Sequence, residues 1–172
     1  MLSPDSVARA TPERAARAAY ILAKNSGATG MVGGQVIDLQ HEGKQVDVAL
    51  LEEMDEKKTG ALIVAAAQMG CVIAGAGEKE VAAAGSYAKA VGLAFQIVDD
   101  ILDVTADAAE LGKPVGSDLS NQKSTYVSLL GLERSKELVC ELTGHAISAL
   151  SAFSGDAAFL AGLAEELSSR KK

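Results

Sequence analysis

The chain has 172 residues, of which 48% are hydrophobic and 23% charged, and its net charge is −7 at pH 7. This length suits one domain with a sizeable core and is marginal for two. The acidic balance argues against nucleic-acid binding, because phosphate contacts need a basic surface. Cys71 and Cys140 are far apart and in no metal-ligand spacing. We therefore expect reduced core cysteines in a cytoplasmic protein.

Helical signals follow one another from the first residues onward. Thr, Pro and Glu at 11–13 predict the start of a helix, and Asn, Ser and Gly at 25–27 predict its end. A second helix is expected over 30–40. Its Gly33 and Gly34 would each weaken an isolated helix by about 1 kcal/mol relative to Ala. Two adjacent glycines there suggest that another backbone packs tightly against this helix.

The rest of the chain is also expected to be helical. One long helix is predicted over 47–77 and another over 78–107. A loop rich in Gly, Ser, Asp and Asn follows at 108–122, and further helices fill 123–172 with a break at Gly155 and Asp156. Sustained period-two alternation is absent from the sequence. The sequence thus predicts an all-α fold and a single helical domain over 1–172.

One uncharged stretch, 60–77, is long enough to be considered as a membrane span. It is dominated by Ala and Gly and contains Gln68, so large apolar side chains are few. This composition favours a buried helix within a globular core. We therefore expect no membrane span in the chain.

Residues 95–103, FQIVDDILD, place three carboxylates in an otherwise apolar run. At about 100° per residue, Asp99, Asp100 and Asp103 share one helix face with Gln96. A solvated acidic face is the simplest interpretation, and glycosidase chemistry would need two carboxylates facing each other across a substrate. The apolar flanks instead indicate a central helix. Clustered carboxylates without His or Cys suit a hard cation such as Mg²⁺.

A magnesium site of this kind predicts a phosphorylated ligand, because Mg²⁺ usually completes its shell with substrate phosphate oxygens. The sequence has no P-loop pattern and no complete GxGxxG, so side chains would have to hold the phosphate. Candidates are 58–59, Lys113 and 123–125, although a single lysine is more typical of a solvated surface. His41 and His145 are isolated, and we expect surface or capping roles for them.

Four stretches occur in the order and spacing of the trans-isoprenyl diphosphate synthases. They are GMVGGQVIDL at 30–39, KTGALI at 58–63, GLAFQIVDDILDV at 92–104, and LGKPVGSD with KSTY between 111 and 126. Over nearly its whole length the chain resembles bacterial farnesyl (geranyltranstransferase) and geranylgeranyl diphosphate synthases. The resemblance implies the C-terminal half of the isoprenoid synthase helical bundle. It also implies a prenyltransferase that joins an allylic diphosphate to isopentenyl diphosphate.

The resemblance also assigns roles to individual residues. DDILD corresponds to the second of two aspartate-rich motifs that hold Mg²⁺ on the allylic diphosphate. Asp99 is then a direct metal ligand, and Asp100 and Asp103 assist through water or a second metal contact. Gln35 and Asp38 lie in a motif that lines the cavity. The positions that match contacts to the allylic diphosphate, with Lys58 and Lys123 in catalytic roles on the leaving group, are Lys58, Thr59, Gln96, Lys113 and Lys123.

Part of the family pattern has no counterpart in this sequence. The first aspartate-rich motif and the basic residues that bind isopentenyl diphosphate are missing, and product chain length is set largely near that motif. We expect the isolated chain to be inactive, and to cover its apolar surface by forming a homodimer or by pairing with the missing N-terminal half. The alternative is a non-catalytic helical subunit that binds and regulates a full-length synthase, but such a subunit would not need the acidic face.

Overall fold

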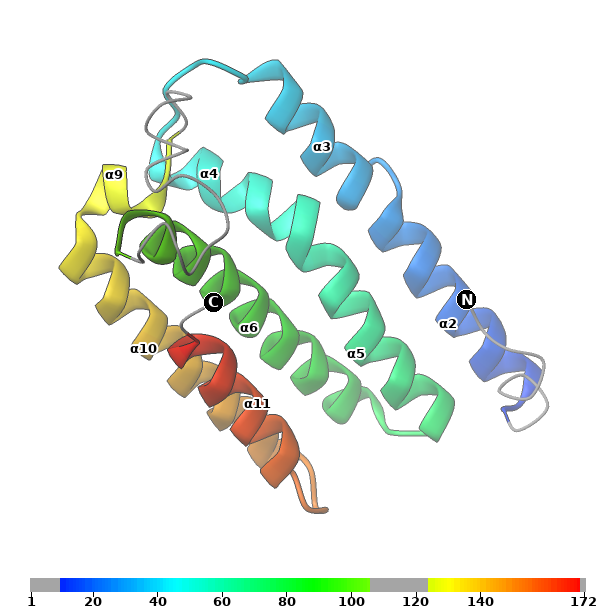
Figure 1. Cartoon of the computed structure of the whole chain (residues 1–172). Coiled ribbons are helices and arrows are strands. Elements are labelled where there is room, and N and C mark those ends of the chain that lie inside the picture. Colours follow the sequence, from blue (N-terminus) through cyan, green and yellow to red (C-terminus); the bar gives the residue numbers. More distant parts are fainter. Residues whose placement is uncertain (1–9, 106–123, 171–172) are drawn as a thin grey trace.

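The computed structural model describes residues 10–105 and 124–170, and in these two ranges the chain forms helices and no strand (Figure 1). The predicted all-α fold is confirmed, whereas the predicted loop at 108–122 lies outside the described residues. The helical elements are α2 (Pro12–Ser26), α3 (Met31–Gln40), α4 (Val48–Asp55), the π-helical segment η1 (Glu56–Gly60), α5 (Ala61–Ala74), α6 (Glu78–Thr105), α9 (Tyr126–Leu130), α10 (Leu132–Ala149), the 3₁₀ turn η2 (Leu150–Ala152) and α11 (Ala158–Ser169).

The helix ends follow the local signals in the sequence. The Thr11 side chain accepts a hydrogen bond from the Arg14 N–H and caps α2, and Gly27 follows the last residue of that helix. Helix α5 ends before Gly75, whose φ of +86° is a left-handed conformation that favours glycine. The predicted helix over 47–77 therefore stops at Ala74, and it contains a π-helical segment that the sequence did not suggest.

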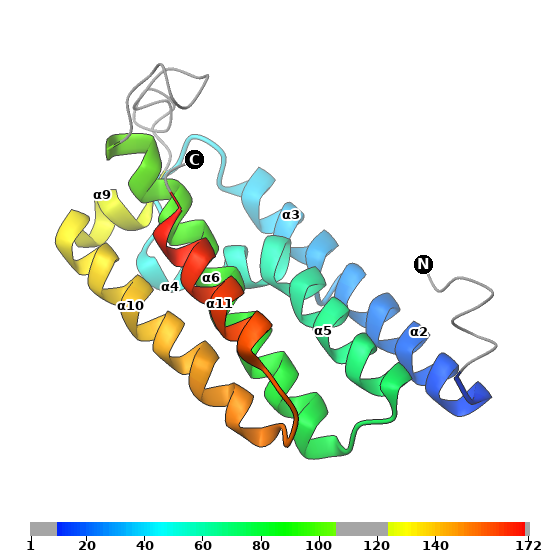
Figure 2. The ribbon, with the colours of Figure 1, turned by 60° about the horizontal axis from the view of Figure 1, so that its bottom comes forward.

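Helix α6 is the centre of the bundle. It packs against α5 on one side and α10 on another, with α11 also against it, while α2 lies on the far side of α5 (Figures 1 and 2). Glycines allow the close approach of α5 and η1. A Cβ on Gly85 would lie 2.6 Å from Nε2 of Gln68, and a Cβ on Gly92 would lie 3.4 Å from the Cα of Gly60. Gly85 and Gly92 thus lie on the face of α6 that is turned toward α5 and η1.

Large apolar side chains are exposed on α2, α3 and α5. The fraction of side chain exposed is 66% for Tyr20 on α2, 61% for Leu39 on α3 and 38% for Leu62 on α5. The expectation that 60–77 is a buried helix is therefore wrong for part of its surface, because α5 is covered by α2 and α6 but not on its remaining face. Cys71 is half-buried and Cys140 is exposed, so the expectation of two core cysteines is also wrong.

Within the part of the chain that the structure describes, two stretches are long and apolar enough to cross a membrane by length and composition alone, Val48–Ala74 and Glu78–Thr105. In the most apolar window of the second, 67% of the residues are buried, as in the core helix of a bundle. In the corresponding window of the first the share is 22%. The absence of a membrane span therefore stays a prediction.

Candidate functional site

The candidate site begins with one stripe along α6. Gly85, Gly92, Gln96, Asp99 and Asp103 recur at spacings of three, four and seven residues, which places them on one helix face. The two glycines, at the N-terminal end of the stripe, pack against α5 and η1. Helix α6 packs closely against α5 and η1 and only sparsely against α4. The stripe is therefore closed at its glycine end and opens where Asp99 lies.

The three aspartates of the stripe have different surroundings. The Asp99 side chain is 51% exposed, whereas Asp103 is 2% exposed. Asp100 is half-buried, and its Oδ2 accepts a hydrogen bond of 2.7 Å from the Tyr126 N–H at the start of α9. A solvated acidic face is thus the wrong interpretation for Asp100 and Asp103. Among the three, Asp99 presents the carboxylate most open to a ligand.

Tyr126, the residue that Asp100 caps, is 1% exposed, and its hydroxyl has no hydrogen-bond partner among the described residues. Burial, and then the nearby carboxylates of Asp55 and Glu52, raise the pKa of this hydroxyl. A raised pKa means that folding favours the neutral phenol. Its contribution to stability is present below about pH 10, the ordinary value for Tyr, and is lost as the pH rises above that.

We expect Tyr126→Phe to leave the free energy of unfolding unchanged or to raise it by about 1 kcal/mol, since it removes a buried, unpaired hydroxyl. The matched control is Tyr87→Phe. The Tyr87 hydroxyl donates to the Leu160 carbonyl at 2.8 Å, so its loss is expected to cost about 1 kcal/mol. Urea denaturation at pH 7 and pH 10.5 tests both. A larger loss for Tyr126→Phe than for Tyr87→Phe would contradict this account.

Lys58 lies on the π-helical segment η1 and is paired with α3. Its Nζ donates to Oδ2 of Asp38 at 2.6 Å, and the two side chains are 36% and 26% exposed. Helix α3 can come this close because Gly34 faces η1, where a Cβ would lie 2.7 Å from the Cα of Lys58. The predicted tight backbone contact is thus confirmed at Gly34. π-Helical turns occur often at functional sites.

Segment η1, which carries Thr59, also packs against α6. Gly60 contacts Gly92, and Glu56 forms an ion pair of 2.7 Å with Lys89, so η1 packs on α6 at two points. Gln96 lies one turn beyond Gly92 on the same stripe. The structure thus brings together three elements that carry predicted site residues: α3, η1 and α6. Lys113 and Lys123 lie outside the described residues, and their roles stay predictions.

A residue that sequence reasoning missed, Arg170, reaches Asp99 from the end of α11. Its Nη2 donates to Oδ1 of Asp99 and, at 3.3 Å, to the Phe95 carbonyl. The guanidinium carbon lies 3.9 Å from the centre of the Phe95 ring, a cation–π contact. No local pattern around residue 170 points to residues 95–99. The contact arises only because α11 packs along α6.

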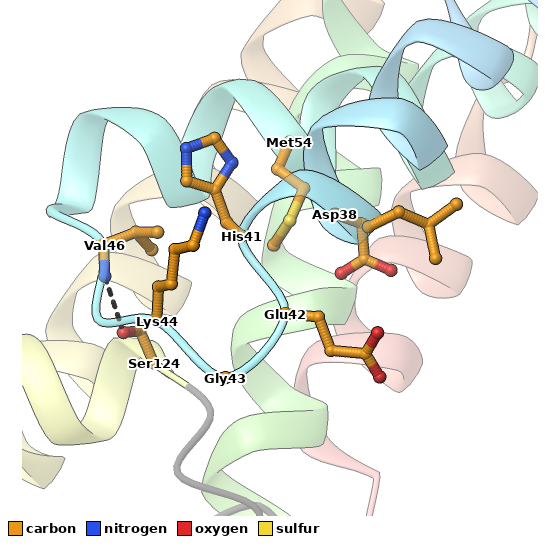
Figure 3. Close-up of a pocket in the computed structure, with 9 residues that line it drawn as sticks. Asp38, His41, Glu42, Gly43, Lys44, Val46, Met54 and Ser124 are labelled. Atoms are coloured by element: carbon orange, nitrogen blue, oxygen red, sulfur yellow. Dashed lines mark hydrogen bonds between the residues drawn. The ribbon is translucent and has the colours of Figure 1, made fainter.

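A cavity of about 500 Å³ is lined by Asp38 and by the loop that follows α3 (Figure 3). Loop 41–47 forms much of its wall, and the Val46 N–H donates to Oγ of Ser124 at 3.0 Å. Nδ1 of His41 lies 2.8 Å from the Ile37 carbonyl, which confirms a capping role at the end of α3. The residues that line the cavity are Asp38, Leu39, His41, Glu42, Gly43, Lys44, Val46, Met54 and Ser124.

The described residues fit a hard cation that shares its shell with a ligand. Among them no group of three or more His, Cys, Asp or Glu could hold a metal ion unaided. Asp99 nevertheless offers carboxylate oxygens, and a positive group, the Arg170 guanidinium, lies against it. Mg²⁺ is commonly bound by one or two carboxylates, with water and substrate phosphate oxygens completing the shell. Asp99 suits that arrangement.

Comparison with known proteins identifies the family of the chain. The family model described as polyprenyl synthetase matches residues 7–149. The chain belongs to the polyprenyl synthetase family. It is 44% identical over 163 residues to geranylgeranyl pyrophosphate synthase 11, chloroplastic, of Arabidopsis thaliana, covering 92% of this chain and 46% of that protein. It is also 44% identical over 155 residues to farnesyl diphosphate synthase of Escherichia coli K12, covering 88% and 52% respectively.

A solved structure of the same family supports the assignment. The geranyltransferase of Helicobacter pylori, complexed with magnesium and isoprenyl diphosphate, superposes with a TM-score of 0.74 at 32% identity, covering 94% of this chain and 53% of that one. The predicted kinship with isoprenyl diphosphate synthases and the all-helical fold are thus confirmed. This member of the family spans about half the length of the curated relatives it matches.

Proposed function

We propose that the chain carries the allylic-diphosphate part of the active site of a farnesyl- or geranylgeranyl-type diphosphate synthase. Such an enzyme joins an allylic diphosphate to isopentenyl diphosphate. The observation that carries this proposal is the packing of η1, the segment that holds Lys58 and Thr59, against both α3 and α6, the helix that carries Gln96 and Asp99. The synthases of Arabidopsis thaliana and Escherichia coli named above favour an enzyme over the alternative of a non-catalytic regulatory subunit.

In this proposal the chain's own polar groups bind and orient the diphosphate. The Lys58 ammonium donates to its oxygens, and the Thr59 hydroxyl and the Gln96 amide are further donors. These groups stabilise the negative charge that grows on the diphosphate as its bond to the allylic carbon breaks. Isopentenyl diphosphate then attacks the allylic cation, and a proton is lost. We also assign Lys113 and Lys123 to the diphosphate by the motif match.

Asp99, assisted by Asp100 and Asp103, would hold Mg²⁺. When bound, the ion would neutralise charge on the leaving diphosphate and orient it. The hydrogen bond from the Tyr126 N–H keeps one oxygen of Asp100 turned toward α9, so Asp100 has an additional structural task. The Lys58 side chain is paired with Asp38 of α3. The Helicobacter relative, described as complexed with magnesium and isoprenyl diphosphate, supports this choice of cation.

The test is calorimetric binding of a non-hydrolysable allylic diphosphate analogue. With Mg²⁺ present we expect saturable binding, and with excess chelator we expect at least tenfold weaker binding. Asp99→Asn should show the weak binding in both conditions, because it keeps the shape of the side chain and removes its charge. Binding that is equally tight in chelator, or unaffected by Asp99→Asn, would contradict the proposed site.

The exposed apolar residues of α2, α3 and α5 support a further part of the proposal, that the chain pairs with a second copy or with a segment that supplies the first aspartate-rich motif. Exposed apolar surface of this kind is usually covered in an assembly. We expect sedimentation velocity at micromolar concentration to show a dimer or larger species, and turnover assays of this chain alone to show no prenyl elongation. A stable monomer, or sustained elongation, would contradict the respective expectation.

A further inference from the structure

We propose that Arg170 is a built-in counter-ion of the acidic motif, which occupies Asp99 while no divalent cation is bound and has to leave it when one binds. The inference rests on the proposed function, because it takes Asp99 to be a cation-binding carboxylate. It goes further by giving the end of α11 a part in cation binding. The last turn of α11 would then report whether the site is loaded.

Several contacts hold the Arg170 side chain in one position against α6. Phe95 and Asp99 lie one turn apart on α6, and the guanidinium contacts both through the ring of Phe95, its carbonyl and the carboxylate of Asp99. The Arg170 side chain is 19% exposed. Arg134 on α10 is 48% exposed and pairs with Glu137 and Glu141 of its own helix. Arg170 alone of these two reaches across to the acidic motif.

Arg170 bound to Asp99 and a metal ion bound to Asp99 exclude each other. A cation bound to the Asp99 carboxylate would lie within a few ångström of the guanidinium, and like charges at that distance repel. The hydrogen bonding of Arg170 in this position is also incomplete, because its buried Nε has no hydrogen-bond partner among the described residues. An unpaired buried donor lowers the stability of the position in which Arg170 is bound to Asp99. Arg170 can therefore be displaced by a competing cation.

Displacement need not detach the whole of α11. The Tyr87 hydroxyl on α6 donates to the Leu160 carbonyl at 2.8 Å and anchors the first half of α11. Ala164 is buried in the same core cluster as Tyr87. Beyond it, Leu167 packs against the edge of the same cluster, and Arg170 joins the last turn to the acidic motif. Release of Arg170 would remove the second of these two contacts, and would therefore loosen residues 165–169 and leave the backbone near Leu160 unchanged.

Hydrogen exchange and metal binding test the inference together, with Mn²⁺ alone as the probe. Saturating Mn²⁺ is expected to speed amide exchange at 165–169 at least threefold while exchange near Leu160 stays constant. Asp99→Asn should exchange fast at 165–169 without metal and should not respond to it. By electron paramagnetic resonance of free Mn²⁺, Arg170→Gln should bind Mn²⁺ about three- to tenfold more tightly, the range expected for loss of a partly buried ion pair with a cation–π contact.

Arg134→Gln is the control for the inference, because it removes the same charge on α10 and should leave Mn²⁺ affinity unchanged. Equal Mn²⁺ affinity for Arg170→Gln and Arg134→Gln, or exchange at 165–169 that ignores both Mn²⁺ and Asp99→Asn, would overturn the inference. If Asp99→Asn still abolished Mg²⁺-dependent analogue binding, the proposed function would stand without it. If Asp99→Asn changed neither Mn²⁺ affinity nor analogue binding, both would fail.

Discussion

Lys58→Gln is expected to weaken binding of the allylic diphosphate analogue in Mg²⁺ by about 10- to 100-fold. The reason is the loss of a charge-assisted hydrogen bond to the diphosphate, which typically contributes about 1.5–3 kcal/mol. The fold should survive, because the side chain is 36% exposed and its ion pair with Asp38 is of the partly solvated kind that contributes about 1 kcal/mol or less. Isothermal calorimetry gives the affinity.

The matched control for Lys58→Gln is a substitution of its ion-pair partner, Asp38. Asp38→Asn removes the same ion pair but keeps the lysine cation, so we expect analogue affinity within about threefold of the unchanged chain. The comparison separates two roles for Lys58. If the lysine only joins η1 to α3, both variants will lose affinity equally. Equal losses would contradict the assignment of Lys58 to the diphosphate.

Gly34→Ala should destabilise the fold strongly, lowering the free energy of unfolding by about 3 kcal/mol. The new Cβ would lie 2.7 Å from the Cα of Lys58, and backbone atoms cannot move aside as the end of a flexible side chain can. The α3–η1 junction would have to separate. Because η1 carries Lys58 and Thr59, analogue binding should fall as well.

Gly70→Ala is the control for Gly34→Ala. Gly70 is an exposed residue inside α5, and a Cβ there would meet nothing within 4 Å. Its replacement should raise the free energy of unfolding by about 0.5–1 kcal/mol through helix propensity. Urea denaturation measures both variants. If Gly34→Ala were as stable as Gly70→Ala, α3 would not lie against η1 as described.

The helices could be predicted because the residues that begin and end them act on their immediate neighbours in the chain. Thr11 and Pro12 begin α2, and Gly75 ends α5 in a conformation that other residues rarely adopt. The shared face of Gln96 and Asp99 likewise follows from a period of 3.6 residues. These features depend on residues within a few positions of one another, so the sequence alone carries them. The paired glycines even indicated the contact of α3 with another backbone, though not with which.

The rest of the site depends on tertiary packing that no local pattern encodes. The segment 56–60 has the composition of an ordinary helical turn, yet it is a π-helix where α3 and α6 meet it. Asp100 and Asp103 differ from Asp99 only because α9 and the core approach one side of α6. Arg170 lies 71 residues from Asp99 in the chain. The open face of α5 likewise depends on which helices are present to cover it.

The central claim is that Asp99 and Lys58 hold a cation and a diphosphate at one junction of α3, η1 and α6. Anomalous diffraction from crystals grown with Mn²⁺ and the allylic diphosphate analogue tests it most directly. We expect an anomalous peak coordinated by the Asp99 carboxylate, with the diphosphate bridging from that peak to the Lys58 Nζ. A peak away from Asp99, or an analogue bound elsewhere, such as the cavity lined by His41 and Lys44, would contradict the claim.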